Sequence, residues 1–471
     1  MTPPQPKEER PLGTLLAPDI LALLDEAPGS VATETEEMHP ADLADVAEAI
    51  PEERVADLLR ALPADRAADV LEYLDEERRA RVLEAMSSAQ AARLVTEMTP
   101  DERADVLDEL EAETAEDILA EIPAEARRET ERLRAYDPDT AGGLMTTEYV
   151  SVPDTMSVAA ALAGVRAAAR GGRKEAMYAV YLTDERGRLR GVLSLRELLA
   201  APDGAPVTDV AWSEVVSVLD VADREEVARV TANYGLVAVP VVDALGRLVG
   251  VVTVDDVIDV IQEEQTEDVQ KLGGMEALDE PYMQIGFGAM IRKRGVWLLV
   301  LFIGEMATAS VMGKFESEID RAIVLALFIP LIISSGGNSG SQATSLIIRA
   351  MALREVGLRD WWRVARREVP TGLVLGAILG TIGFARILAW QSLGWADYTE
   401  HYMRVAFAVG AALVGVVTFG SLTGSMLPFA LRRLGFDPAS ASAPFVATLV
   451  DVTGIAIYFT VAAILLRGVL L

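Results

Sequence analysis

The chain of 471 residues contains no cysteine and only two histidines, His39 and His401. Without cysteine there can be no disulfide bond, no thiolate zinc site and no cysteine nucleophile, and two scattered histidines are too few for an imidazole metal cluster. We predict no catalytic residues and no enzyme. Any metal that the protein binds is expected to meet oxygen ligands.

The sequence also lacks a secretory signal and is poor in basic residues. Residues 1–10 are polar and proline-rich, without an apolar core after a basic start, so the first half is expected to stay on the side of synthesis. Residues 291–471 carry 16 Lys+Arg against 11 Asp+Glu, net +5, and the whole chain carries −30, which leaves −35 on residues 1–290. This acidic half disfavours nucleic acid as a partner and favours cations.

Residues 40–134 repeat with a step of about 12 residues. Each segment opens on proline or a capping residue, has acids in its first turn and places apolar residues at helical spacing, as in 51–62. We predict short helices that pair into a helical solenoid. Such a domain could act as a lever that responds to a partner or an ion, or as a plain scaffold. The segments open at Pro40, Pro51, Pro63, Asp75, Ser87, Pro100 and Pro123.

An internal duplication follows, in which the pattern of 179–198 recurs 59 residues later at 238–257. Each copy predicts a strand, a turn at Gly187 or Gly246, a second strand and a helix capped by Ser194 or Thr253. The duplication resembles a pair of CBS domains, an α+β regulatory module. In that family a Gly-x-x-Ser/Thr-x-x-Asp pattern can hold a nucleotide ribose, and no aromatic platform for adenine is evident at Ala179 or Leu236. The resemblance implies ATP as a candidate ligand, at Ser194, Arg196 and Glu197.

Acids at short spacing follow the second copy, from Asp255 to Asp268. At helical spacing Glu264, Glu267 and Asp268 share a face, where like charges destabilise a helix unless something neutralises them. Two interpretations stay open: a solvated helix face, and a divalent-cation site between this connecting helix and its acidic neighbours.

Five apolar segments are each long enough to cross a bilayer: about 295–313, 322–348, 371–393, 405–430 and 444–466. Arginines and lysines gather before the first segment, between the second and third, and between the fourth and fifth, all on one side. The positive-inside rule therefore predicts a multi-pass protein of the inner (plasma) membrane with a cytoplasmic N-terminus and an external C-terminus. Because five spans offer little material for a pore within one chain, we predict a homodimer in the lipid bilayer.

Two features of the membrane half predict an ion pathway. We expect Gly336, Gly337 and Gly340 to break the second span, and irregular backbone at that depth must pack against protein or line a wet cavity. Asp451 is a carboxylate in the last span, where charge is costly and normally functional. It could instead be a proton relay or a packing residue. Glu305, in the first span, is a second intramembrane acid with no assigned role.

An acidic helical domain, a CBS pair, an acid-rich connecting helix and five spans with Gly-Gly-Asn-x-Gly-x-Gln and Asp-Val-Thr-Gly resemble the MgtE family of magnesium channels. The resemblance implies a homodimeric Mg²⁺ channel, with Asn338, Asp451 and the carbonyl of Ala447 at ion-binding positions of the pore. It further implies that cytosolic Mg²⁺ closes the pore through the connecting "plug" helix. The implied regulatory ligands are Asp69, Asp101, Asp105, Asp223, Glu225, Asp256, Asp259, Glu264, Glu267 and Asp268.

The expected architecture is multidomain: an all-α helical-repeat domain at 1–140, an α+β CBS pair at 141–262, a connecting helix at 263–290 and an α-helical membrane domain with five transmembrane helices at 291–471. The alternative function is a secondary transporter that couples divalent-cation movement (Mg²⁺, Co²⁺, Mn²⁺) to H⁺ or Na⁺; a CBS-regulated receptor without transport is a third. Three positions depart from the family pattern: Ser334 for glycine, Ala443 for asparagine, and Gly235 for an acid.

Overall fold

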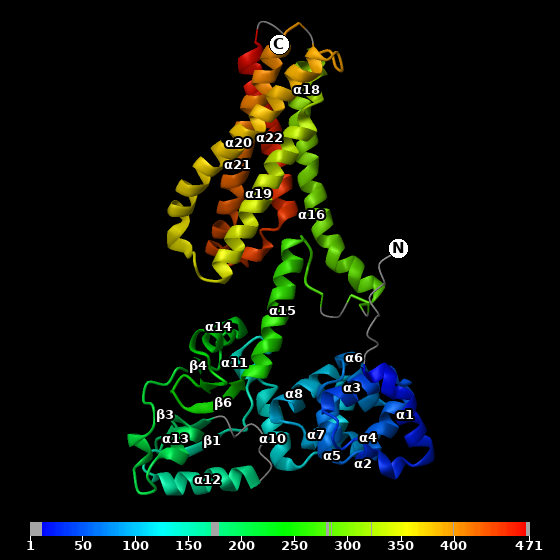
Figure 1. Ribbon diagram of the computed structural model, residues 1–471, viewed down its shortest axis with the longest axis vertical. Coiled ribbons are helices and arrows are strands. Elements are labelled where there is room, and N and C mark those ends of the chain that lie inside the picture. The colour runs from blue at the N-terminus through cyan, green and yellow to red at the C-terminus, as the bar shows by residue number, and fades with distance from the viewer. Residues whose placement is uncertain are drawn as a thin grey trace, which may run out of the picture. The chain divides into compact units, whose positions relative to one another are not determined.

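The computed structural model describes residues 12–170, 179–278, 282, 283, 285–321, 323–398 and 400–467. Its internal contacts divide the chain into two compact units, Met1–Ile261 and Gln262–Leu471. Short helices and two small sheets build the first unit, and long helices build the second (Figure 1).

The first unit begins with the predicted helical repeat. Pro40 and Pro100 open their helices, and Pro51, Pro63 and Pro123 directly precede theirs, so the predicted segment starts are confirmed. Helices α1 to α9 bury apolar residues in a common core. The sequence did not predict α1 or the start of α9. The helices are α1 Leu12–Glu26, α2 Val31–Glu34, α3 Pro40–Ala49, α4 Glu52–Ala61, α5 Ala64–Glu72, α6 Glu76–Glu84, α7 Ser88–Glu97, α8 Pro100–Glu109, α9 Ala112–Glu121 and α10 Ala124–Leu133, with a 3₁₀ turn η1 at Pro28–Ser30.

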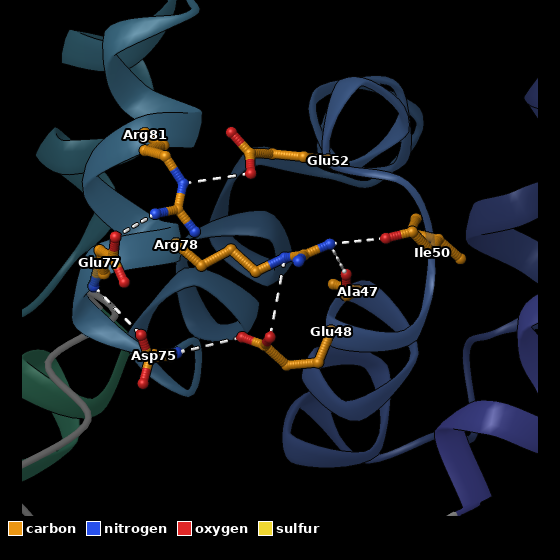
Figure 2. Close-up of polar contacts among 8 residues, drawn as sticks. All are labelled: Ala47, Glu48, Ile50, Glu52, Asp75, Glu77, Arg78 and Arg81. Atoms are coloured by element: carbon orange, nitrogen blue, oxygen red, sulfur yellow. Dashed lines mark hydrogen bonds and ion pairs between the residues drawn. The ribbon is translucent and has the colours of Figure 1, made fainter. Parts of the chain in front are cut away.

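Arginine side chains of one repeat donate hydrogen bonds to the preceding repeat (Figure 2). The Arg78 guanidinium on α6 donates to the carbonyl oxygens of Ala47, at 2.8 Å, and Ile50, at 2.6 Å, at the end of α3. Nearby, Arg81 Nε donates to Glu52 Oε2 at 3.1 Å. The last carbonyls of a helix have no partner within it, so a side-chain donor from the next repeat satisfies them and fixes the stacking.

The predicted duplication is confirmed as two three-stranded sheets of the same topology. In each, a parallel pair is followed by an antiparallel hairpin, and the register shifts at Leu182/Thr183 in one copy and 59 residues later, at Val241/Val242, in the other. The strands are β1 Val150–Pro153, β2 Ala179–Thr183, β3 Leu189–Ser194, β4 Val218–Leu219, β5 Ala238–Val242 and β6 Leu248–Thr253; the helices are α11 Ala141–Leu144, α12 Val158–Arg170, α13 Leu195–Ala200, the 3₁₀ turn η3 Val207–Asp209 and α14 Arg224–Tyr234.

The connecting helix differs from the expected range of 263–290. It is α15, Val254–Leu272, and it begins directly after strand β6. It ends at Gly273 and Gly274, and Gly274 has a φ of +76°, a left-handed conformation that favours glycine and stops a helix. The next helix begins at Phe287.

The second unit contains the five predicted membrane-spanning helices, and their number and order are confirmed among the described residues. They are α16 Phe287–Lys314, α19 Ile329–Ala352 with the short α18 Ile323–Ala326 before it, α20 Trp361–Ser392, α21 Tyr402–Arg433 and α22 Ala443–Leu466; α17 Glu316–Arg321 and the 3₁₀ turns η4 Leu358–Asp360 and η5 Pro438–Ser440 lie between them. Helices α19, α21 and α22 share the buried core of this unit.

The expected backbone break at Gly336, Gly337 and Gly340 is wrong, because α19 is continuous from Ile329 to Ala352. The glycines serve helix packing instead. A Cβ built on Gly336 would lie 2.5 Å from Val416 Cγ1, and one on Gly420 would lie 2.3 Å from the Gly336 carbonyl oxygen. Small residues that let backbones approach closely are the usual basis of helix association in membranes.

This packing gives a first testable prediction, for Gly420→Val. The added side chain must displace α19 from α21, and overpacking of this kind costs about 3 kcal/mol or more when backbone has to move. We expect a clear fall in the unfolding temperature of the purified protein and loss of a monodisperse peak in size-exclusion chromatography. Gly313→Ala is the matched control, because a Cβ there meets nothing within 4 Å; equal destabilisation by both variants would contradict the packing argument.

Candidate cation pathway and regulatory sites

The three predicted pore positions line one cavity of about 380 Å³ between α19 and α22. Asn338 on α19 faces it, as do Ala447 and Asp451, which lie one helical turn apart on α22. Carboxylate, amide and carbonyl oxygens are the ligands that hard divalent cations prefer. The remaining lining residues are Pro330, Ile333, Ser334, Gly337 and Ser341.

Two positions that depart from the family pattern, Ser334 and Ala443, have a role in the structure. Ser334 lines the cavity and adds a hydroxyl to it. At Ala443 the backbone carbonyl accepts a hydrogen bond of 3.2 Å from the Ser341 hydroxyl, which ties the start of α22 to α19. Ser334 therefore contributes a polar group to the cavity, whereas Ala443 lies outside its lining and contacts α19 through its backbone.

In the first unit, the structure brings two predicted regulatory acids together. Asp101 on α8 is buried, and its Oδ1 has no hydrogen-bond partner among the described residues. Asp256, in the first turn of α15, accepts a hydrogen bond of 2.7 Å from Thr253. Burial raises the pKa of both carboxyls, and the charge of Asp101 raises the pKa of Asp256 further. An orphaned carboxylate oxygen beside a second carboxylate fits a hard cation.

Neighbouring acids on α8 extend this cluster. Burial and the charge of Asp101 raise the pKa of Glu102 to about 8. Asp105 follows on the same helix, with an exposed side chain. Arg79 partly offsets them: one guanidinium nitrogen lies 3.7 Å from Glu102, and its Nε donates to Glu109 at 2.9 Å. Sequence reasoning missed Glu102, although its position next to Asp101 in an acidic first turn was visible.

These raised pKa values predict how stability depends on pH. An acid whose pKa is raised in the folded state binds more protons folded than unfolded, so stability falls as the pH rises through the window between the two values. For Glu102 that window runs from its ordinary pKa of 4.5 to about 8. We expect the first unit of the metal-free protein to unfold at a higher temperature at pH 5 than at pH 8.

Glu102→Gln should reduce the slope of the unfolding free energy against pH by the equivalent of up to one bound proton, because it removes the group whose pKa is shifted most clearly. Glu113→Gln, at an exposed position on α9, is the control and should leave the dependence unchanged. Calorimetric scans at several pH values in the presence of a chelator measure the pH dependence of both variants. A pH slope that is equal in the two variants would contradict the assignment.

A second acidic group lies at the end of α15, within the second unit. Burial and the charges of Asp437 and Glu264 raise the pKa of Asp268. Lys271 donates to Asp437 Oδ2 at 2.7 Å and also pairs with Glu267; although burial lowers its pKa, these two partners raise it on balance. Sequence reasoning missed Asp437, which precedes Pro438 in the loop before α22.

The other predicted regulatory residues are dispersed. Asp223 caps α14 by accepting a hydrogen bond of 2.8 Å from the backbone N–H of Glu225. Asp69, on α5, is half-buried, and Asp259, on α15, has a pKa that is raised by burial and by Asp255. Within the described ranges, no group of three or more His, Asp or Glu is arranged to hold a metal ion. Their metal binding stays a prediction.

The departure at Gly235 has a structural reason. This residue ends α14 in the left-handed conformation, with φ of +62°. An acidic residue would be strained at this φ, whereas glycine adopts it freely. The position therefore serves to end the helix here.

The candidate nucleotide residues surround the start of α13. Ser194 and Glu197 form a capping box, and the Glu197 carboxylate also accepts a hydrogen bond of 2.8 Å from the Trp212 indole, which lowers its pKa. Arg196 is exposed. Trp212, with an exposed fraction of 66%, is an aromatic residue beside the candidate site that sequence reasoning missed, because it lies outside the duplicated motif.

Comparison with known proteins assigns each part of the chain. Family models match at residues 329–461 (divalent cation transporter), at 38–139 (MgtE intracellular N domain), and at 141–204 and 207–263 (CBS domain). The magnesium transporter MgtE of Thermus thermophilus is 45% identical over 343 residues, which are 73% of this chain and 74% of the relative. The chain belongs to the MgtE family. The MgtE of Enterococcus faecalis is 36% identical, with 72% of each protein covered.

Solved structures agree with the MgtE assignment of the soluble half. A crystal structure of the cytosolic domain of the Mg²⁺ channel MgtE in complex with ATP is 37% identical to this chain. It has a TM-score of 0.50 and covers 52% of this chain and 99% of that one. The predicted architecture of helical domain, CBS pair and membrane helices is thereby confirmed, and the chain belongs to a family of magnesium transporters. Apart from the bounds of the connecting helix, the domain boundaries expected from the sequence stay a prediction.

Proposed function

We propose that this protein is a Mg²⁺-selective channel for magnesium uptake, with its ion site at Asp451, Asn338 and the carbonyl of Ala447. The observation that carries the proposal is their convergence on one cavity inside the membrane half. Mg²⁺ gives up its water reluctantly, so the carboxylate and amide hold the ion largely through its hydration shell. A carboxylate at this depth is costly, and binding of cations accounts for its presence.

The proposed channel is a homodimer that spans the lipid bilayer of the inner (plasma) membrane. A two-fold axis along the membrane normal would bring two copies of Asp451 face to face and close the cavity into a narrow acidic pathway. The N-terminus is cytoplasmic and the C-terminus external, in line with Arg292, Lys293 and Arg294 near the start of α16 and with the arginines where α19 leads into α20 and α21 into α22.

Cytosolic Mg²⁺ closes this channel by binding to the acidic soluble half. The oxygen of Asp101 without a hydrogen-bond partner lies beside Asp256, and Glu264 and Asp268 lie beside Asp437, so carboxylates are close together at both places. Divalent ions at such places would turn repulsion into attraction and stabilise one arrangement of the domains. ATP is a further proposed ligand, at Ser194, Arg196 and Glu197; the support is the ATP complex of the 37% identical cytosolic domain.

Flux into proteoliposomes tests the proposal. Full-length protein is reconstituted around a Mg²⁺-sensitive dye, and external Mg²⁺ is added with or without an imposed H⁺ or Na⁺ gradient. A channel gives uptake that follows the Mg²⁺ gradient and the membrane potential in every case. Uptake that requires the H⁺ or Na⁺ gradient would establish the alternative, a coupled secondary transporter, and absence of uptake would overturn both.

A further inference from the structure

Helix α16 packs against α22 through a glycine inside the membrane. A Cβ built on Gly304 would lie 2.7 Å from Thr448 Cγ2, so the two helices approach more closely than a larger residue would allow. Glu305 directly follows Gly304, and Asp451 lies one helical turn beyond Thr448. The crossing therefore brings two acidic residues from different helices to the same level of the membrane.

Glu305 is the charged residue that neighbours Asp451 across this helix crossing. Asp451 also lines the cavity between α19 and α22, so Glu305 reaches the candidate ion site through it. Thr308 lies one turn after Gly304 on the same face of α16, and its buried hydroxyl has no hydrogen-bond partner in the described part of the chain. Glu305 and Thr308 are thus polar groups within the largely apolar span of α16.

Two neighbouring carboxylates repel each other unless positive charge lies beside them. No Lys or Arg of the described chain contributes to the electrostatic environment of Asp451, whose charged neighbour is Glu305. One monovalent cation leaves an excess negative charge on the pair, whereas one divalent cation neutralises both carboxylates. A second carboxylate therefore favours divalent over monovalent ions by electrostatics, without any change in the cavity lining.

We propose that Glu305 is a specificity-determining residue of the pathway, which supplies the second carboxylate at Asp451 and makes the site prefer divalent over monovalent cations. The proposal rests on the function proposed above, because it assigns a role at the same ion site. Glu305 acts through Asp451 and through its charge, so its removal changes affinity and selectivity rather than abolishing passage.

Glu305→Gln tests this role, since it removes the charge while keeping the size and hydrogen-bonding ability of the side chain. In proteoliposomes we expect the Mg²⁺ concentration for half-maximal flux to rise about tenfold, as removal of one nearby unit charge implies. The maximal rate should change little, and Na⁺ flux in the absence of Mg²⁺ should rise. Glu305→Asp retains the charge and should restore most of the affinity and selectivity.

Glu316→Gln removes the same charge from the end of the span and is the matched control. If Glu305→Gln leaves both the half-maximal concentration and the Na⁺ flux unchanged while Asp451→Ala abolishes Mg²⁺ flux, the proposal is overturned and the channel function stands. If neither variant alters Mg²⁺ flux, the channel function fails as well. Should Glu305→Gln not assemble, Glu305→Ser replaces it with the same expected shifts.

Discussion

Asp451→Ala is expected to reduce Mg²⁺ flux by roughly a hundredfold or more, while the protein still folds and assembles. Asp451 supplies the carboxylate of the cavity that also contains Asn338 and the Ala447 backbone, and a divalent ion crossing a low-dielectric region depends strongly on such charge. Because an intramembrane carboxylate is costly, its loss should leave the unfolding temperature unchanged or raise it. Flux and thermal unfolding are measured on the same preparation.

Two variants separate charge from packing in this experiment. Asp451→Asn keeps the shape of the side chain and should lose nearly as much flux as Asp451→Ala. Thr453→Ala lies on the same helix but outside the cavity, where its hydroxyl bonds the Leu449 carbonyl of its own helix at 2.8 Å, and should conduct normally. Normal Mg²⁺ flux through well-assembled Asp451→Ala protein would show that the pathway lies elsewhere.

The second large effect is expected in Asp256→Ala combined with Glu264→Ala. In the wild-type protein, millimolar Mg²⁺ should protect the soluble half from protease, around 135–150 and 262–285, and should close the channel. Several ions with modest preference for one state can together supply the ~5.5 kcal/mol that swings an equilibrium from 1:99 to 99:1. The double variant removes ligands from both acidic groups, so protection and closure should weaken together.

The matched control removes two exposed acids from α9, with Glu113→Ala and Glu116→Ala, and should keep both responses to Mg²⁺. Its net charge equals that of the double variant, which separates specific ligands from general charge reduction. The feedback model fails if protease protection and channel closure respond to Mg²⁺ independently of each other. It also fails if deletion of residues 1–262 leaves Mg²⁺-dependent closure unchanged, and the pore assignment would survive either result.

Most of the architecture could be predicted because it follows from local periodicity. Prolines and capping residues mark the starts of the short helices, and the 59-residue duplication reproduces even the register shift of the two hairpins. The five spans follow from length and apolarity. Asn338 and Asp451, which the family resemblance implies as ion-binding positions, line one cavity, and their binding of an ion stays a prediction.

What could not be predicted depends on contacts between distant segments. The glycines of α19 gave the signal of a broken helix, but their role is set by Val416 and Gly420 on α21, about eighty residues away. The pairing of Lys271 with Asp437, the indole of Trp212 at Glu197, and the contact of Glu305 with Asp451 likewise require the folded chain. In each case the sequence shows the residue types but not which residues contact one another.

Single-channel recording from the reconstituted full-length protein, with Mg²⁺ as the only permeant cation, tests the central claim most directly. We predict unitary currents that follow voltage and the Mg²⁺ gradient, that disappear in Asp451→Ala, and whose open probability falls when Mg²⁺ is added on the side of the soluble half. Mg²⁺ uptake without unitary currents, at a low rate that saturates and tracks an H⁺ or Na⁺ gradient, would contradict the channel and establish a coupled transporter.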